Sequence, residues 1–226
     1  MNSHSFHNET VSVVIGGHTG IGHAVAQALS ERPGRVEMVS RRNGLDLADP
    51  STVAAYFERL GPLDHLIITA GSAAPGGNLT EIDVDAAKAA FDIKFWGSIA
   101  SAREAAKRLR PGGTITLTSG FLSRRATSGA YVKTAMNAAL EAVAKVLAKE
   151  LSPLRVNVIS PGLTDTEAYA KMPEEARVAM LVRAAQNLPA KRYGRAEDLS
   201  RGYLFVIDNP FVTGAVIDID GGALVG

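Results

Sequence analysis

The sequence predicts an α/β fold in which helices cover both faces of a parallel sheet of six to seven strands. Apolar runs of four to six residues alternate with longer segments of helical period, as expected for strand–helix units around a sheet covered on both sides. A glycine-rich turn follows the first of these apolar runs. With 226 residues, 46% of them hydrophobic, the chain is long enough to bury one large core.

The strands and helices can be placed along the chain in order. Strands are expected at residues 11–15, 35–40, 63–69, 113–118, 155–160 and 215–220. Helices are expected at about residues 21–30, 50–59, 84–109, 131–151, 173–187 and 196–207. Asp49 before Pro50 predicts an N-cap ahead of a proline in the first helical turn. Pro-Gly-Gly at 111–113 is expected to end the long helix.

The connection after the second expected strand is unusually short. Only about five residues separate that strand from Leu45-Asp46-Leu47, where a further short strand would fit. A crossover between parallel strands normally needs a dozen or more residues. We therefore expect the crossover helix to be missing here.

The overall composition excludes several classes of protein. Lys and Arg (24) nearly balance Asp and Glu (23), so the chain lacks a basic footprint for nucleic acid. The absence of cysteine excludes disulfides and thiolate metal sites, and the histidines show no metal-binding spacing. No apolar run approaches the roughly 18 residues of a membrane span, and the cytoplasm fits best. We expect residues 1–10 to form a flexible tail and residues 11–226 a single domain.

The segment 16–22 reads GGHTGIG and leads from the first expected strand directly into a helix. Gly16 suits the tight turn, Gly20 lets the backbone approach a pyrophosphate, and Gly22 permits close packing of the helix on the strand. The N–H groups at the start of the helix then face the phosphates. This context predicts a dinucleotide-binding Rossmann fold, although glycines also mark plain turns. The other loop residues expected to contact the cofactor are His18, Thr19 and Ile21.

The spacing G-x-x-x-G-I-G resembles the cofactor loop of the short-chain dehydrogenase/reductase family. Further likenesses follow in order over nearly the whole chain: LDL at 45–47, TAG at 69–71, NVISPG at 157–162, TG at 213–214 and DIDGG at 218–222. The resemblance implies that Asp46 meets the adenine amine and that the segment after residue 160 holds the nicotinamide carboxamide. The positions to which it assigns cofactor contacts are Asp46, Leu47, Ala70, Gly71, Pro161, Gly162, Thr164 and Thr166.

The end of the second expected strand indicates which dinucleotide is bound. An NAD enzyme usually places an acid there to hold the ribose 2′-OH, whereas the 2′-phosphate of NADP calls for arginine. Here the strand ends in Ser40-Arg41-Arg42, with no acid in reach. We therefore expect NADP(H) in preference to NAD(H), the alternative being a solvated basic turn.

The resembled family uses an active-site Ser, a Tyr-x-x-x-Lys pair and an Asn from the preceding helix, and this chain departs from that pattern. Ser119, in TLTSG, matches the Ser. Counting back from LAKEL at 147–151, which resembles the family's Leu-Ala-x-Glu-Leu, puts Lys133 at the Tyr position and Asn137 at the Lys position. Lys94 stands at the Asn position. The candidate catalytic set is therefore Ser119, Lys133, Asn137 and Lys94.

Each member of this set can be given a role. Lys133, beside a second lysine and an oxidised nicotinamide ring, should release its proton easily, as an acid–base group requires. Residues 133 and 137 lie one helical turn apart on a shared face, so Asn137 can hydrogen-bond the ribose. Ser119 would hold the substrate oxygen. Tyr131 reaches the site only if the helix begins late and the loop turns it inward.

These assignments predict an NADP(H)-dependent oxidoreductase that transfers hydride between the nicotinamide and a small carbonyl or alcohol substrate. One alternative is a catalytically silent NADP(H)-binding protein, acting as a redox sensor or as the partner of an active paralogue. Another is lysine-dependent lyase or imine chemistry. The resemblance also implies a mobile lid over the substrate at about residues 166–190 and a homodimer or homotetramer.

Overall fold

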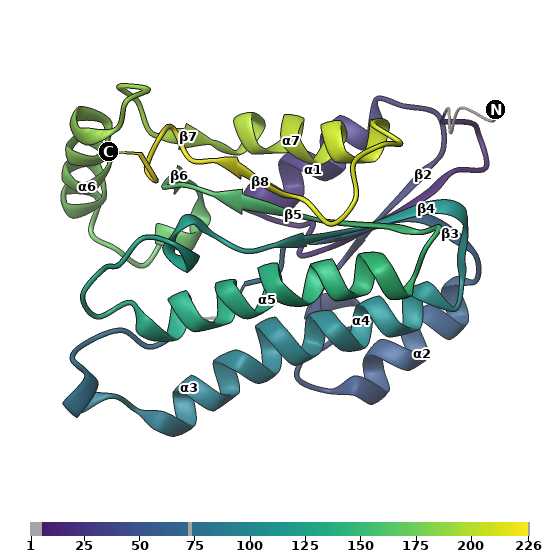
Figure 1. Ribbon diagram of the computed structural model, residues 1–226, viewed down its shortest axis with the longest axis horizontal. Helices are drawn as coiled ribbons and strands as arrows, with labels where there is room; N and C mark the ends of the chain where they lie inside the picture. Colours follow the sequence, from purple (N-terminus) through teal and green to yellow (C-terminus); the bar gives the residue numbers. More distant parts are fainter. Residues whose placement is uncertain (1–5, 72–73, 226) are drawn as a thin grey trace.

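The computed structural model describes residues 6–71 and 74–225, and its centre is a six-stranded parallel sheet (Figure 1). The strand order is β2-β1-β3-β4-β5-β8, and every neighbouring pair is parallel. Its strands are β1 (Val11–Ile15), β2 (Arg35–Val39), β3 (Leu63–Ile68), β4 (Leu109–Thr118), β5 (Arg155–Pro161) and β8 (Val216–Ile219). A second sheet pairs only β6 (Thr164–Asp165) with β7 (Gly194–Arg195).

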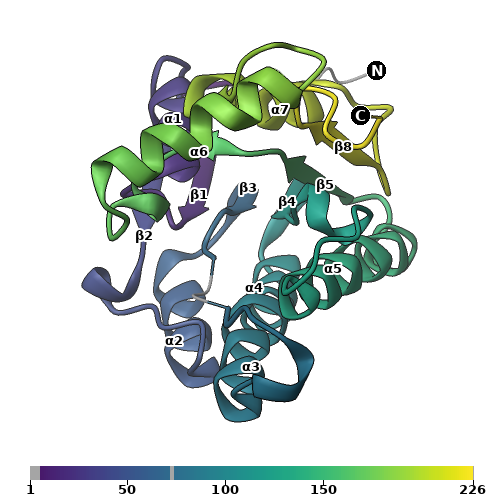
Figure 2. The same ribbon diagram turned by 90° about the vertical axis from the view of Figure 1, so that its left-hand side faces the viewer.

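Helices cover both faces of the sheet, as predicted. They are α1 (Gly20–Ser30), α2 (Pro50–Leu60), α3 (Val84–Phe91), α4 (Gly97–Ala106), α5 (Tyr131–Glu150), α6 (Glu174–Asn187) and α7 (Ala196–Asp208). Helices α1 and α7 pack together on one face, while α2, α4 and α5 lie on the other (Figures 1 and 2). Helix α6 lies beyond the carboxyl ends of the strands. The fold is thus a doubly wound Rossmann type.

The core follows from the continuous apolar character of the strands. Every residue of β1 and β5 is buried, as expected for strands covered on both faces. One cluster of buried side chains lies between the sheet and the α2–α4–α5 layer, and the other lies under α1 and α7. The Phe6 ring packs 5.2 Å from the His65 ring, with the Arg32 guanidinium over its face, so the described end of the predicted tail contacts the domain.

The short strand predicted at Leu45-Asp46-Leu47 is not formed. Strand β2 is followed by a 3₁₀ turn, η1 (Arg41–Asn43), which ends at Gly44 with φ of 87°. Leu45 and Leu47 are buried in the core, but the connection is too short to return the chain as another parallel strand. The crossover helix is missing, as predicted, and the main sheet ends at β2 with six strands.

The long helix predicted at 84–109 is interrupted. A π-helical turn, η3 (Asp92–Trp96), lies between α3 and α4, and α4 ends at Ala106. The predicted stop at Pro-Gly-Gly is wrong because β4 already begins at Leu109, where a register shift against β3 accommodates Pro111 and Gly112 within the strand. Lys94 lies inside the π turn, a type of distortion that is frequent at functional sites.

Candidate active site

Seven of the predicted cofactor-binding residues border one cavity of about 300 Å³ at the carboxyl end of the sheet. They come from four separate segments: the ends of β1, β2 and β3, and the loop that replaces the crossover. Ile15, Leu45 and Ile93 complete the cavity with apolar side chains. The seven residues are Gly16, Ser40, Arg41, Asp46, Leu47, Ala70 and Gly71.

The glycine loop has the geometry that a phosphate-binding turn requires. Gly16 and Gly20 have φ of 89° and 55°, a region that side chains rarely adopt. A Cβ at Gly22 would collide with the carbonyl oxygen of Gly16, so the close approach of α1 to β1 depends on this glycine. Thr19 precedes α1 without capping it through its side chain, so the N–H groups of the first turn are free to meet an anion. The exposed His18 and the half-buried Ile21 flank that turn.

The second predicted cofactor segment lies against this loop. Pro161 ends β5, and a Cβ at Gly162 would lie 2.5 Å from the Cα atom of Asp220, so this turn is tightly packed. Thr164 donates a hydrogen bond from Oγ1 to the Gly162 oxygen at 3.0 Å. A methyl group at Gly20 would lie 3.3 Å from Cβ of Thr166, which brings the two segments into contact.

Around the expected ribose site, one carboxylate and two guanidinium groups can still bind a ligand. The Asp46 carboxylate accepts the Ala48 N–H through Oδ1 at 3.0 Å, while no hydrogen bond to Oδ2 is found among the described residues. Arg41 and Arg42 are exposed, and neither guanidinium forms an ion pair within the described part of the chain. This end of the cavity therefore offers unneutralised positive charge. The residues present fit an NAD(P) dinucleotide.

Three members of the predicted catalytic set are joined by hydrogen bonds, and one of them, Lys94, directly follows Ile93 of this cavity. Nζ of Lys94 donates a hydrogen bond to Oδ1 of Asn137 at 2.7 Å and another to the main-chain oxygen of Ser119 at 3.3 Å. Asn137 and Ser119 are each only 5% exposed. Lys94, which precedes α4, is thus joined to the buried face of α5 and to the end of β4.

Lys94 has an unusual acidity for a lysine. Burial, and then the positive charge of Lys133, lower the pKa of Lys94 from 10.5 to about 8. No carboxylate pairs with its ammonium group among the described residues, because its two hydrogen bonds go to an amide and a main-chain oxygen. Lys94 therefore exchanges a proton close to neutral pH.

Glu141 also belongs to this cluster, although no motif in the sequence marks it. Its Oε1 accepts hydrogen bonds from the hydroxyls of Ser119 at 2.8 Å and Ser123 at 2.6 Å, and its Oε2 lies 3.2 Å from Nε of Arg124. Arg124 also pairs with Asp218. A glutamate in a helix usually faces solvent, yet the spacing 133, 137, 141 places Glu141 on the same face as the predicted residues. This spacing is the sequence feature from which the place of Glu141 could have been predicted.

Lys133 and Tyr131 both lie in the first turn of α5 but face different surroundings. Lys133 is exposed and forms no hydrogen bond or ion pair within the described residues, although its charge acts on Lys94. Tyr131 instead packs against the apolar cluster of Ala90, Val132 and Met136, and its buried hydroxyl has no hydrogen-bond partner among the described residues. Because α5 begins at Tyr131 itself, the late start that would turn this side chain toward Ser119 does not occur.

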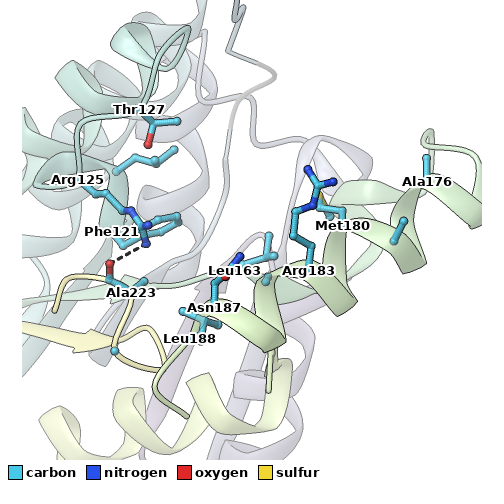
Figure 3. A pocket seen from close by; sticks show the side chains of 14 residues that line it. Phe121, Arg125, Thr127, Leu163, Ala176, Met180, Arg183, Asn187, Leu188 and Ala223 are labelled. Atoms are coloured by element: carbon cyan, nitrogen blue, oxygen red, sulfur yellow. Dashed lines mark hydrogen bonds between the residues drawn. The ribbon is translucent and has the colours of Figure 1, made fainter. Parts of the chain in front are cut away.

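A larger cavity of about 590 Å³ lies under α6 and next to the cluster (Figure 3). Its walls come from the loop after Ser119, from α6 and from the C-terminal segment. The 3₁₀ turn η4 (Phe121–Ser123) joins it to the cluster, because Phe121 lines the cavity and Ser123 bonds to Glu141. This cavity is the candidate substrate site.

Comparison with known proteins identifies relatives over nearly the whole chain. A family model described as enoyl-(acyl carrier protein) reductase matches residues 6–223. A short-chain dehydrogenase/reductase of Acremonium sp is 31% identical over 249 residues, covering 94% of each protein. A solved small-chain dehydrogenase in complex with NADPH is 52% identical, with a TM-score of 0.95 over 96% of this chain and 100% of that one. A short chain dehydrogenase from Burkholderia cenocepacia J2315 in complex with NADP is 26% identical, with a TM-score of 0.84 over 98% and 99%.

The chain therefore belongs to the short-chain dehydrogenase/reductase family of NAD(P)-binding oxidoreductases, as the resemblance implies. Within residues 6–71 and 74–225, no helix is both long and apolar enough to cross a membrane. The same part of the chain contains no group of three or more His, Cys, Asp or Glu side chains that could hold a metal ion.

Proposed function

We propose that the protein is an NADP(H)-dependent oxidoreductase that transfers hydride between the nicotinamide and a small carbonyl or alcohol substrate, using an altered catalytic set. The observation that carries the proposal is that Lys94 forms hydrogen bonds with Asn137 and Ser119 and directly follows Ile93, which lines the cofactor cavity. The cluster keeps one lysine, one asparagine and one serine at positions that resemble those of the family. Its chemistry then depends on how these groups are protonated.

The preference for NADP(H) rests on charge at the ribose end of the cavity. Arg41 lines this cavity, Arg42 follows it, and both are exposed without an ion-pair partner among the described residues. A guanidinium group can bind a 2′-phosphate through two parallel hydrogen bonds. The NADPH and NADP complexes of the solved relatives support the same choice.

The bound cofactor would supply the hydride, and the side chains supply orientation and proton transfer. We assign proton exchange with the substrate oxygen to Lys133, whose ammonium group is exposed at the start of α5. Asn137 accepts a 2.7 Å hydrogen bond from Lys94, and we assign contact with the nicotinamide ribose to this pair. The Ser119 hydroxyl donates its hydrogen bond to Glu141, so its oxygen lone pairs remain available to accept a hydrogen bond from a substrate hydroxyl.

One observation favours lysine-dependent imine chemistry as a second candidate. With a pKa of about 8, roughly a tenth of Lys94 is unprotonated at pH 7, and an unprotonated amine is the form that attacks a carbonyl. Borohydride reduction with a carbonyl compound, followed by mass spectrometry of the peptide that contains Lys94, tests this candidate. A stable adduct on Lys94 would favour it over hydride transfer.

Stopped-flow mixing tests the oxidoreductase proposal directly. NADPH-loaded protein is mixed with a panel of ketones and aldehydes while the NADPH absorbance is followed. We expect its loss with at least one substrate and a much slower loss in Lys133→Met. NADPH binding that stays tight without turnover across the panel would overturn the proposal and favour the catalytically silent alternative.

We also propose assembly as a homodimer or homotetramer. Trp96 and Val146, in η3 and α5, expose more than half of their side-chain surface, which supports burial of this helical layer against another copy. Light scattering of the purified protein would measure the mass, and a monomer at working concentration would contradict this assignment.

A further inference from the structure

The cavity under α6 is built mainly from apolar side chains. Phe121 and Leu122 line it from η4, Met180 from α6, and Leu163 and Leu188 from the segments beside that helix. Figure 3 shows α6 and the loop with Phe121 facing each other across the space. A ligand that fills this cavity therefore needs an apolar body.

Among the described residues that line this cavity, two are charged. Both are arginines, and they project from opposite walls (Figure 3). Arg183 projects from α6 and forms no hydrogen bond or ion pair with any described residue. Arg125 projects from the loop after η4 and donates from Nη1 to the Ala223 oxygen at 2.8 Å, and no described carboxylate pairs with it. The lining contains no Asp or Glu among those residues.

In the described part of the chain, three nearby arginines outside the cavity form ion pairs with carboxylates, unlike the two that line it. Arg177, on the same helix as Arg183, pairs with Asp165. Arg192 pairs with Asp198, and Arg124, next to Arg125 in sequence, pairs with Asp218 and Glu141. Among the described residues, carboxylates thus pair with these nearby arginines and not with the two that line the cavity. A bound anion would neutralise the guanidinium groups of these two arginines.

We propose that the substrate is an organic anion, with an apolar body that carries a carbonyl or hydroxyl group and one carboxylate, and that Arg183 and Arg125 select its charge. This inference rests on the proposed function, since it names the substrate class of the same site. The apolar walls accommodate the body, and η4 brings its reactive group toward Ser119. The two guanidinium groups then hold the carboxylate away from the cofactor.

Binding measurements can test this independently of turnover. Protein saturated with NADP is titrated calorimetrically with 3-benzoylpropanoate, its methyl ester, and a small panel of similar acid and ester pairs. We expect tighter binding of the acids, and a loss of about tenfold in that preference in Arg183→Gln, because Arg183 is exposed and its hydrogen bonds are partly screened. Arg125→Gln should reduce the preference in the same direction.

Matched variants separate this effect from a general change of charge or fold. Arg183→Lys keeps the positive charge and should retain part of the preference, whereas Arg59→Gln, on the exposed end of α2, should leave it unchanged. Equal binding of acids and esters, binding of no acid in the panel, or an unchanged preference in Arg183→Gln would overturn the inference. Acids that bind through Arg183 but are never reduced or oxidised would instead overturn the proposed hydride transfer and leave this inference standing.

Discussion

Nζ of Lys94 donates a hydrogen bond of 2.7 Å to Oδ1 of Asn137, two residues that are 43 positions apart in the sequence. The contact joins the π turn η3 to the buried face of α5. Because Asn137 is buried, losing its partner would leave a polar group without compensation. The pair is therefore a structural unit as well as a part of the site.

A double-mutant cycle tests whether the pair acts as a unit. Lys94→Asn is too short to reach Asn137, and Asn137→Lys brings a second ammonium toward Lys94, so each single change should lower the free energy of unfolding. The double variant restores one lysine and one asparagine in reversed order. We expect a favourable coupling of about 1–2 kcal/mol, measured by urea unfolding at pH 7. Additive losses would contradict the idea of an exchangeable pair.

The stability of the protein should depend on the protonation of Lys94. In the unfolded chain Lys94 keeps its proton up to about pH 10.5, whereas in the fold it releases it near pH 8. Below pH 8 the fold must therefore hold an ammonium that its surroundings disfavour, and this penalty is relieved as the pH rises from 8 to 10.5.

Lys94→Gln removes this penalty while keeping an N–H donor for Asn137. We expect the variant to be more stable than the wild type at pH 7 by on the order of 1 kcal/mol, with the advantage disappearing toward pH 10.5. Urea unfolding across this pH range measures it. In Lys133→Gln the lost charge should raise the pKa of Lys94 and move the window to higher pH. A Lys94→Gln protein that is less stable at pH 7 would contradict the argument.

Glu141 should be essential for the order of the segment that contains Ser119. Glu141→Ala leaves the hydroxyls of Ser119 and Ser123 and the guanidinium of Arg124 without their shared acceptor, and we expect a loss of about 2–3 kcal/mol in the free energy of unfolding. Glu141→Gln keeps one acceptor oxygen and should lose less than half as much.

The same two variants separate positioning from simple stability. If Glu141 orients the Ser119 hydroxyl, Glu141→Gln should lower kcat while the dissociation constant for NADPH stays unchanged, because the cofactor cavity does not include Glu141. Steady-state kinetics and a fluorescence titration of NADPH give the two quantities. Equal kcat in the wild type and in Glu141→Gln would show that this contact only stabilises the fold.

The sequence was sufficient to predict the fold because its signals are local and repeated. Strand β1 matches its predicted bounds, and α5 begins at the predicted residue, since apolar runs and turn residues mark these ends. The π turn has no comparable mark, because one extra residue in a helix changes neither composition nor period noticeably. The short connection after β2 could be predicted because its length alone forbids a crossover.

The site was predicted only in part, and for a physical reason. Lys94, Asn137 and Ser119 occupy motif positions, so their meeting could be expected from order along the chain. Glu141 has no motif, and its role depends on the rotation of α5 against the loop after β4, which is a tertiary relationship. The free state of Arg183 likewise depends on which carboxylates the fold places near it.

The choice between NADPH and NADH should depend on Arg41. This side chain lines the cavity beside Ser40 and Asp46 and has no carboxylate partner among the described residues, so its charge is available to a 2′-phosphate. In Arg41→Ala we expect NADPH to bind about tenfold more weakly or worse, while NADH, which lacks the phosphate, changes by less than about twofold. Calorimetric titration of both cofactors measures the ratio, and Arg59→Ala controls for the loss of one surface charge.

Because added salt screens an exposed ion pair, the NADPH preference of the wild type should also shrink as ionic strength rises, whereas that of Arg41→Ala should respond much less. Equal weakening of the two cofactors would mean that Arg41 only supports the loop, and the phosphate would then have to be held elsewhere.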